Sequence, residues 1–158
     1  MRVLGLDPGT VRTGWGVVER QGPRLRHCSA GVIRVPEGLP LHERLQRIHT
    51  GLVEVIEQTA PQVVAVEDIF YAKHANAALK LGHVRGVALL VAANAALEVH
   101  AYPPATVKKA VVGRGRADKR QVARLVGAIL HLKELPGVDA TDALAIAITH
   151  LSVARLRP

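Results

Sequence analysis

The chain has 158 residues, of which 49% are hydrophobic and 22% charged, a composition that excludes a disordered or fibrous protein. No apolar run reaches the roughly 18 to 20 residues of a membrane span, and the single Cys28 forms neither an internal disulfide nor a zinc set. Twenty-one Lys and Arg against thirteen Asp and Glu give a net charge of +8, which favours a polyanionic partner, nucleic acid first. We expect one cytoplasmic domain over residues 1–158, since the N-terminus resembles no signal peptide.

The first half of the chain predicts strands before any helix. Residues 2–7 and 13–19 are apolar and flank a Pro-Gly-Thr turn, and 25–35 is rich in β-branched and apolar residues. After a break rich in proline, apolar residues at helical spacing predict an amphipathic helix over 41–58. The short apolar run 63–67 is typical of a strand that is covered on both faces.

The second half predicts mainly helices. The predicted elements are a loop with aromatic residues (DIFYAKH), a helix over 76–97, a strand over 98–102, and helices over 103–113, 118–132 and 139–156. Asp118 with Gln121 three residues later resembles a capping box that starts the helix over 118–132. Strands and helices in this order predict an α/β fold with a five-stranded mixed sheet flanked by helices.

Four of the thirteen acids occupy positions where an apolar residue is expected. Asp7 and Glu67 each end an apolar strand, and Asp139 and Asp142 begin a last helix that is otherwise almost wholly apolar. Their i, i+3 spacing places the two aspartates on one face of that helix. Each acid also has a purely structural explanation: Asp7 as a turn residue, Glu67 as a strand-end acid beside Asp68, and Asp139 as a helix N-cap with Asp142 facing the helix dipole.

One hypothesis explains all four acids together. Two strand ends and a helix start can meet at one rim of a sheet, where three or four carboxylates repel unless a cation neutralises them. Oxygen-only sites that also meet phosphate favour Mg²⁺ or Mn²⁺, and a pair of such ions supports in-line phosphoryl displacement. Together with a basic surface beside it, the set therefore indicates a metal-dependent enzyme that acts on a nucleic-acid backbone.

The positive charge is concentrated in one segment. Between residues 108 and 124 a single acid, Asp118, lies among seven basic residues: Lys108, Lys109, Arg114, Arg116, Lys119, Arg120 and Arg124. Such a run is often only a solvated face. Because it includes a Gly-Arg-Gly-Arg turn between two helical segments, and guanidinium groups match phosphate oxygens, we expect it to contact phosphates.

Four collinear stretches resemble the RuvC family of crossover-junction endonucleases: GLDPGTVRTGWGVV, the strand ending in Glu67 with IFYAKHANAALKLGHVRGVALLVAA, AYPPATVKKAVVGRGRADKRQV, and DATDALAIAITH. The resemblance covers nearly the whole chain. It implies a ribonuclease H-like fold, a homodimer, and cleavage of four-way (Holliday) junction DNA in recombination and repair by paired symmetric nicks. It also implies two Mg²⁺ or Mn²⁺ ions per site with DNA bound, and the branch-migration complex RuvA–RuvB as a partner.

The resemblance also assigns roles to residues. The family's four catalytic, metal-binding acids fall on Asp7, Glu67, Asp139 and Asp142, its junction-inserting aromatic falls on Phe70, and its two active-site lysines fall on Lys108 and Lys119. Lys109, Arg114, Arg116 and Arg120 are expected to contact DNA with these lysines. Gly82 and Gly86 share one face of the 76–97 helix, which is our candidate for the dimer seam, although the same face could pack on the chain's own sheet.

Two other functions fit part of the sequence. LDPGT also resembles the phosphate-binding loop of actin-like ATPases and sugar kinases, but those proteins close two lobes around a nucleotide and 158 residues accommodate only one. A non-catalytic nucleic-acid binder would keep the basic segment but has no need of four acids at a sheet rim.

Overall fold

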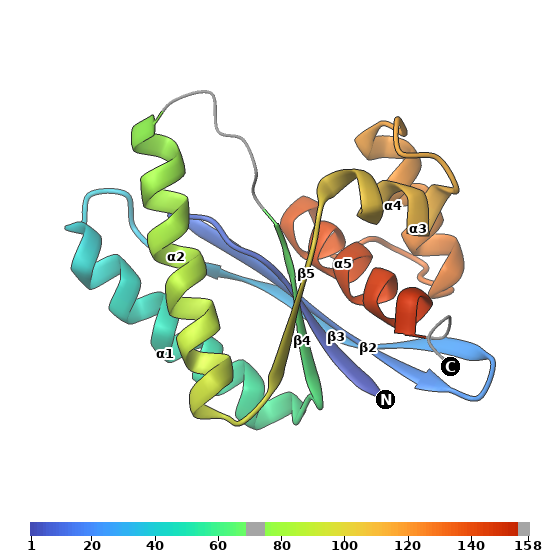
Figure 1. Ribbon diagram of the computed structural model, residues 1–158, viewed down its shortest axis with the longest axis horizontal. Helices are drawn as coiled ribbons and strands as arrows, with labels where there is room; N and C mark the ends of the chain where they lie inside the picture. The colour runs from blue at the N-terminus through green and yellow to red at the C-terminus, as the bar shows by residue number, and fades with distance from the viewer. Residues whose placement is uncertain (69–74, 155–158) are drawn as a thin grey trace.

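The computed structural model describes residues 1–68 and 75–154, and a five-stranded sheet lies at its centre (Figure 1). The strands are β1 (Arg2–Asp7), β2 (Arg12–Gln21), β3 (Arg24–Arg34), β4 (Val63–Glu67) and β5 (Glu98–Tyr102). They lie in the order β3-β2-β1-β4-β5. Because β2 runs antiparallel to both β1 and β3, whereas β1, β4 and β5 are parallel, the predicted mixed sheet is confirmed.

Helices cover both faces of this sheet. Those in the described residues are α1 (Leu41–Thr59), α2 (Ala75–Asn94), α3 (Pro104–Val112), α4 (Lys119–Ile129) and α5 (Val138–Ala154). Figure 1 shows α1 and α2 on one face and α3, α4 and α5 on the other. None of these helices combines the length and apolarity that crossing a membrane requires.

Side chains along each strand point alternately to the two faces of the sheet, so the protein has two hydrophobic cores, one on each face. In β4, Val64 and Val66 pack with the residues of α1 and α2, whereas Val63 and Ala65 pack with those of α3, α4 and α5. All four side chains are buried, so the prediction of a strand covered on both faces is confirmed.

Most predicted boundaries within the described residues agree with the structure to within one residue, and three predicted ends differ by two or three. β2 continues to Gln21 because it pairs with β3 up to a tight turn in which Gly22 has a φ of 60°. α2 ends at Asn94 rather than 97, and α4 at Ile129 rather than 132. Just beyond each helix a residue takes a left-handed conformation, Ala96 with φ 55° and His131 with φ 53°. The side-chain pattern alone gives no sign of either reversal.

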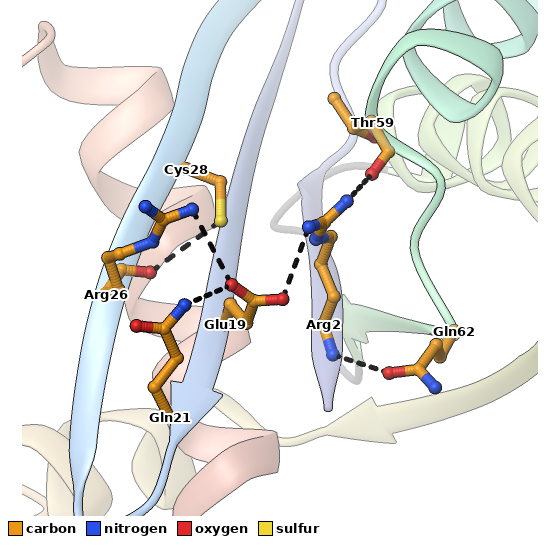
Figure 2. Close-up of polar contacts among 7 residues, drawn as sticks. All are labelled: Arg2, Glu19, Gln21, Arg26, Cys28, Thr59 and Gln62. Atoms are coloured by element: carbon orange, nitrogen blue, oxygen red, sulfur yellow. Dashed lines mark hydrogen bonds and ion pairs between the residues drawn. The ribbon is translucent and has the colours of Figure 1, made fainter.

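Polar contacts fix the start of β1 (Figure 2). The guanidinium of Arg2 donates to the carbonyl oxygen of Thr59 at 2.8 Å and to the Glu19 carboxylate at 3.2 Å, while its backbone N–H donates to Gln62 at 2.9 Å. Glu19 also pairs with Arg26 at 3.6 Å. These contacts join β1 to β2, β3 and the end of α1. They hold β1 in the register that places Asp7 at the other end of the strand.

Glycines let α5 lie directly on β1 and β2. A Cβ atom at Gly5 would collide with the carbonyl oxygen of Ala143, and one at Gly14 would collide with that of Asp139. Because the helix backbone approaches the strands this closely, the first turn of α5 reaches the edge of the sheet where β1 ends. This packing brings the acids of the last helix toward Asp7.

Candidate active site

The first two candidate acids lie at the ends of neighbouring strands. β1 and β4 are parallel with Leu6 opposite Val66, so the next residue on each strand, Asp7 and Glu67, ends its strand at the same edge. In both strands the preceding residue packs toward α1 and α2, which turns the acid toward the face that carries α5. The sequence prediction that these two strand ends meet is confirmed.

The other two acids reach this edge from α5. The helix begins at Val138, so Asp139 lies within its first turn, and the alternative that Asp139 is the N-cap is wrong. Asp142 follows one turn later on the same side. Both carboxylates are paired with cations: Asp139 with Arg12 of β2 at 3.5 Å and Asp142 with Lys119 of α4 at 3.2 Å.

A cavity of about 280 Å³ joins most of the candidate residues. Its polar and charged lining is Asp7, Glu67, Asp142, Lys108 and Lys119, and its apolar lining includes Pro104, Val107, Val122, Ala145 and Ile146 from α3, α4 and α5. Asp139 is not part of this lining and lies beside it, next to Gly14. The cavity therefore gathers three of the four predicted acids and both predicted lysines.

A capping box places Lys119. The Asp118 carboxylate accepts a hydrogen bond from the backbone N–H of Gln121 at 2.8 Å, and the Gln121 side chain accepts one from the Asp118 backbone N–H at 3.1 Å. The predicted capping box is thus confirmed. Because it fixes the first turn of α4, Lys119 is held at the mouth of the cavity.

The acids are mutually destabilising in their charged forms. Burial, followed by the charges of Asp142, Glu67 and Asp139, raises the pKa of Asp7 to about 7. Burial and then Asp142 also raise the pKa of Glu67. In return, Asp142 raises the pKa of Lys119. The site is therefore short of positive charge, and a further cation would stabilise the carboxylates of Asp7 and Glu67.

The donor chemistry fits a hard divalent cation. Asp7, Glu67, Asp139 and Asp142 offer only carboxylate oxygens, the ligands that Mg²⁺ and Mn²⁺ prefer. As placed, no three His, Cys, Asp or Glu side chains among residues 1–68 and 75–154 form a group that could enclose an ion. Lys119 and Arg12 engage Asp142 and Asp139, so a cation held by these carboxylates would compete with both basic side chains.

The other predicted residues lie around the cavity or outside the residues that the structure describes. Lys109, Arg114, Arg116 and Arg120 are exposed on α3, the connection to α4, and α4 itself, and none of them lines the cavity. Phe70 falls outside the described residues. Asp68, to which the sequence assigned no role, pairs with Arg85 of α2 at 3.4 Å, and its backbone N–H donates to the Tyr102 carbonyl oxygen at 2.8 Å.

Two kinds of residue escaped the sequence prediction. Gly5 and Gly14 admit α5 to the sheet, and their signal was present, because glycine inside a strand often marks the close approach of another backbone. Arg12 reaches Asp139 only because the turn after Asp7 brings β2 back along β1. No spacing rule in the sequence connects residues 12 and 139.

Comparison with known proteins agrees with this geometry. Residues 3–150 match the family model of the crossover junction endodeoxyribonuclease RuvC. A protein of that name from Citrifermentans bemidjiense is 51% identical over 150 residues, covering 95% of this chain and 92% of its own length. Its counterpart from Syntrophotalea carbinolica is 53% identical, with 95% and 93% covered.

Solved structures extend the match to three dimensions. T. thermophilus RuvC in complex with Holliday junction substrate has a TM-score of 0.94 and 40% identity, with 99% of this chain and 96% of that chain covered. The yeast mitochondrial Holliday junction resolvase Ydc2, at 12% identity and a TM-score of 0.66, shares the fold. The fold is thus the expected ribonuclease H-like one, and the ATPase alternative is not favoured. The chain belongs to the RuvC family of crossover junction endodeoxyribonucleases.

Proposed function

We propose that this protein resolves four-way (Holliday) junction DNA in homologous recombination and repair by metal-dependent hydrolysis of phosphodiester bonds. One observation carries the proposal: Asp7, Glu67 and Asp142 converge with Lys108 and Lys119 on one cavity at the edge of the sheet. A non-catalytic DNA binder has no use for a carboxyl group, Asp7, whose pKa is raised by burial and by its acidic neighbours. Family membership over residues 3–150 independently favours the nuclease.

The four acids would hold Mg²⁺ or Mn²⁺, two ions per site with DNA bound. Such ions lower the pKa of a bound water and stabilise the leaving oxygen. The pKa of Asp7 is about 7, and a cation held beside it would favour the charged carboxylate. Asp139 and Asp142 would then exchange their present partners, Arg12 and Lys119, for the cation.

The lysines of the cavity would act on the phosphate. Lys119 lies 3.2 Å from Asp142, and once released its ammonium group can donate to a non-bridging oxygen and stabilise the charge that develops there. Lys108 lines the same cavity from α3. Lys109, Arg114, Arg116 and Arg120 would hold the flanking backbone, and the family resemblance gives Phe70 the insertion into the junction.

A homodimer would supply two sites for paired nicks. Leu79 and Leu90 on α2 are 63% and 55% exposed. A Cβ atom at Gly82 or Gly86, on the same side of this helix, would meet no other atom within 4 Å, so these glycines do not serve packing on the chain's own sheet. A second copy of the helix fits this face.

The resemblance also implies the RuvA–RuvB complex as a partner, and the free thiol of Cys28 suits a reducing cytoplasm.

The direct test is cleavage of a synthetic four-way junction in Mg²⁺. Asp7→Asn should abolish cutting and keep junction binding, because it removes a metal ligand but no part of the basic surface. Glu54→Gln, an exposed acid on α1, is the matched control and should cut normally. ATP hydrolysis without nuclease activity, or binding without any cleavage by the unmodified protein, would contradict the proposal.

A further inference from the structure

We infer that Arg12 and Arg34 form a second phosphate-binding site for the DNA strand being cut, on the side of the acids away from Lys108 and Lys119. The inference rests on the proposed function, because it extends the path of the same DNA. It assigns a ligand to the ends of β2 and β3, which lie outside the basic 108–124 segment.

The two arginines are neighbours on one face of the sheet. Arg12 and Arg34 are directly opposite each other in the antiparallel β2–β3 pair, and directly opposite residues project to the same side. Arg12 contacts Asp139 of α5, so that side is the face on which α5 lies. The ladder continues just past the pair, where the Val35 backbone N–H donates to the Val11 carbonyl oxygen at 2.9 Å.

Their charges are not balanced within the protein. Like charges directly opposite each other on neighbouring strands are destabilising. Arg12 has one acidic partner, Asp139, at 3.5 Å, and is still 59% exposed. Arg34 is exposed, and its side chain has no hydrogen bond or ion pair with any residue in 1–68 or 75–154. A pairing that costs stability and leaves both guanidinium groups open to solvent favours an external anion.

Structural stability explains only one member of the pair. Arg12 can be understood as the partner that neutralises Asp139. Arg34 contributes nothing to that contact and adds repulsion to it. If Asp139 turned to hold a metal ion, Arg12 would lose its acidic partner. The two neighbouring guanidinium groups could then both donate hydrogen bonds to phosphate oxygens.

The spacing of the strands places the pair close to the reaction. Neighbouring strands are about 4.8 Å apart, so β2 and β3 lie about 5 and 10 Å from β1, which carries Asp7. One DNA strand has a phosphate about every 3.4 Å of helix axis. Consider a DNA strand that passes over the ends of the β-strands with its cleaved bond at Asp7. One of its phosphates then lies over Arg12 and Arg34, at most about three nucleotides from that bond.

The test measures the salt dependence of junction binding by the full-length protein. All variants carry Asp7→Asn so that the DNA stays intact, and anisotropy of a labelled four-way junction is followed from 50 to 300 mM KCl. Arg34→Gln should reduce the slope of log K against log salt by about 0.9 for each lost phosphate contact. Arg34→Lys should keep the slope. Arg24→Gln, at the other end of β3, is the matched control and should behave like the parent.

A neutral backbone then locates the contact. Junctions carry one methylphosphonate at each of the first three phosphates on either side of the mapped cleavage position. At one of these positions the methylphosphonate should weaken junction binding by the parent several-fold. The same methylphosphonate should not weaken junction binding by the Arg34→Gln variant any further. Equal slopes for the parent and Arg34→Gln, or losses that add at every position, would overturn this inference alone. Failure of the parent to bind any junction would overturn the proposed function as well.

Discussion

The acid cluster predicts that Asp7 lowers the stability of the fold when no metal is present. Its pKa in the folded protein is about 7, against 3.8 for a free side chain. The folded state therefore binds a proton more tightly than the unfolded state does, and the free energy of unfolding falls as the pH rises from about 4 to 7. Above pH 7 the cost of the charged Asp7 is fully present.

The size of this effect follows from the pKa difference. A difference of about three pKa units corresponds to about 4 kcal/mol, which is an upper limit because the side chain is not fully buried and solvent screens its charge. Asp7→Asn removes the charge but still leaves a polar group in the cavity, and it loses the attraction of Lys119. We expect the variant to be more stable than the wild type by about 1–2 kcal/mol at pH 8, or roughly 3–6 °C in Tm for a chain of this size.

The assay is thermal unfolding in EDTA at pH 5, 6, 7 and 8, with Glu54→Gln as the control. The gain from Asp7→Asn should be largest at pH 8 and shrink steadily toward pH 5. Added Mg²⁺ should raise the Tm of the wild type more than that of Asp7→Asn, because only the wild type keeps the complete ligand set. A variant that is less stable than the wild type at pH 8 in EDTA, or a gain independent of pH, would refute this reasoning.

Four further predictions concern the packing of α5, the dimer seam and the lysine of the cavity. Gly14→Ala should destabilise the fold by about 1–3 kcal/mol or more in urea unfolding, because its Cβ collides with the Asp139 carbonyl oxygen; unchanged stability would show that α5 does not lie so close. Gly86→Ala should instead stabilise the subunit by about 0.5–1 kcal/mol as a better helix former and weaken dimerisation in sedimentation experiments, and undisturbed dimers would exclude this face as the seam. Asp118→Ala should cost about 1 kcal/mol through loss of the helix cap, and it should slow single-turnover cleavage through Lys119, whereas a normal cleavage rate would show that the cap does not position that lysine. Lys119→Gln should reduce the cleavage rate more than junction affinity, and an equal loss in both would make Lys119 a binding residue only.

The order of strands and helices was predictable because each element carries its own local pattern. The apolar runs that end in Asp7 and Glu67 read as buried strands, and the breaks at proline and glycine separated the helices. Because neighbouring parallel strands end at the same side of a sheet, the meeting of these two acids followed from local patterns. The capping box at Asp118 was equally local and was found.

The remaining parts depend on contacts between distant segments. Gly5 and Gly14 decide which face of the sheet α5 covers. The sequence of the helix itself contains no pattern that predicts how closely it packs on the strands. The pairing of Lys119 with Asp142, and of Arg12 with Asp139, joins residues from different elements across the edge of the sheet. The outward direction of Gly82 and Gly86 was also undecidable from spacing, since a small-residue face serves close packing within one chain and between two chains equally.

The proposed function requires that the four acids form one nuclease site. Its most direct test is single-turnover cleavage of a synthetic four-way junction, measured beside junction affinity, for Asp7→Asn, Glu67→Gln, Asp139→Asn and Asp142→Asn. We predict that each variant cuts at least about a hundredfold more slowly in Mg²⁺ and still binds the junction with an affinity close to that of the wild type. Wild-type cleavage by any of the four, or cutting that persists in excess EDTA, would contradict the claim.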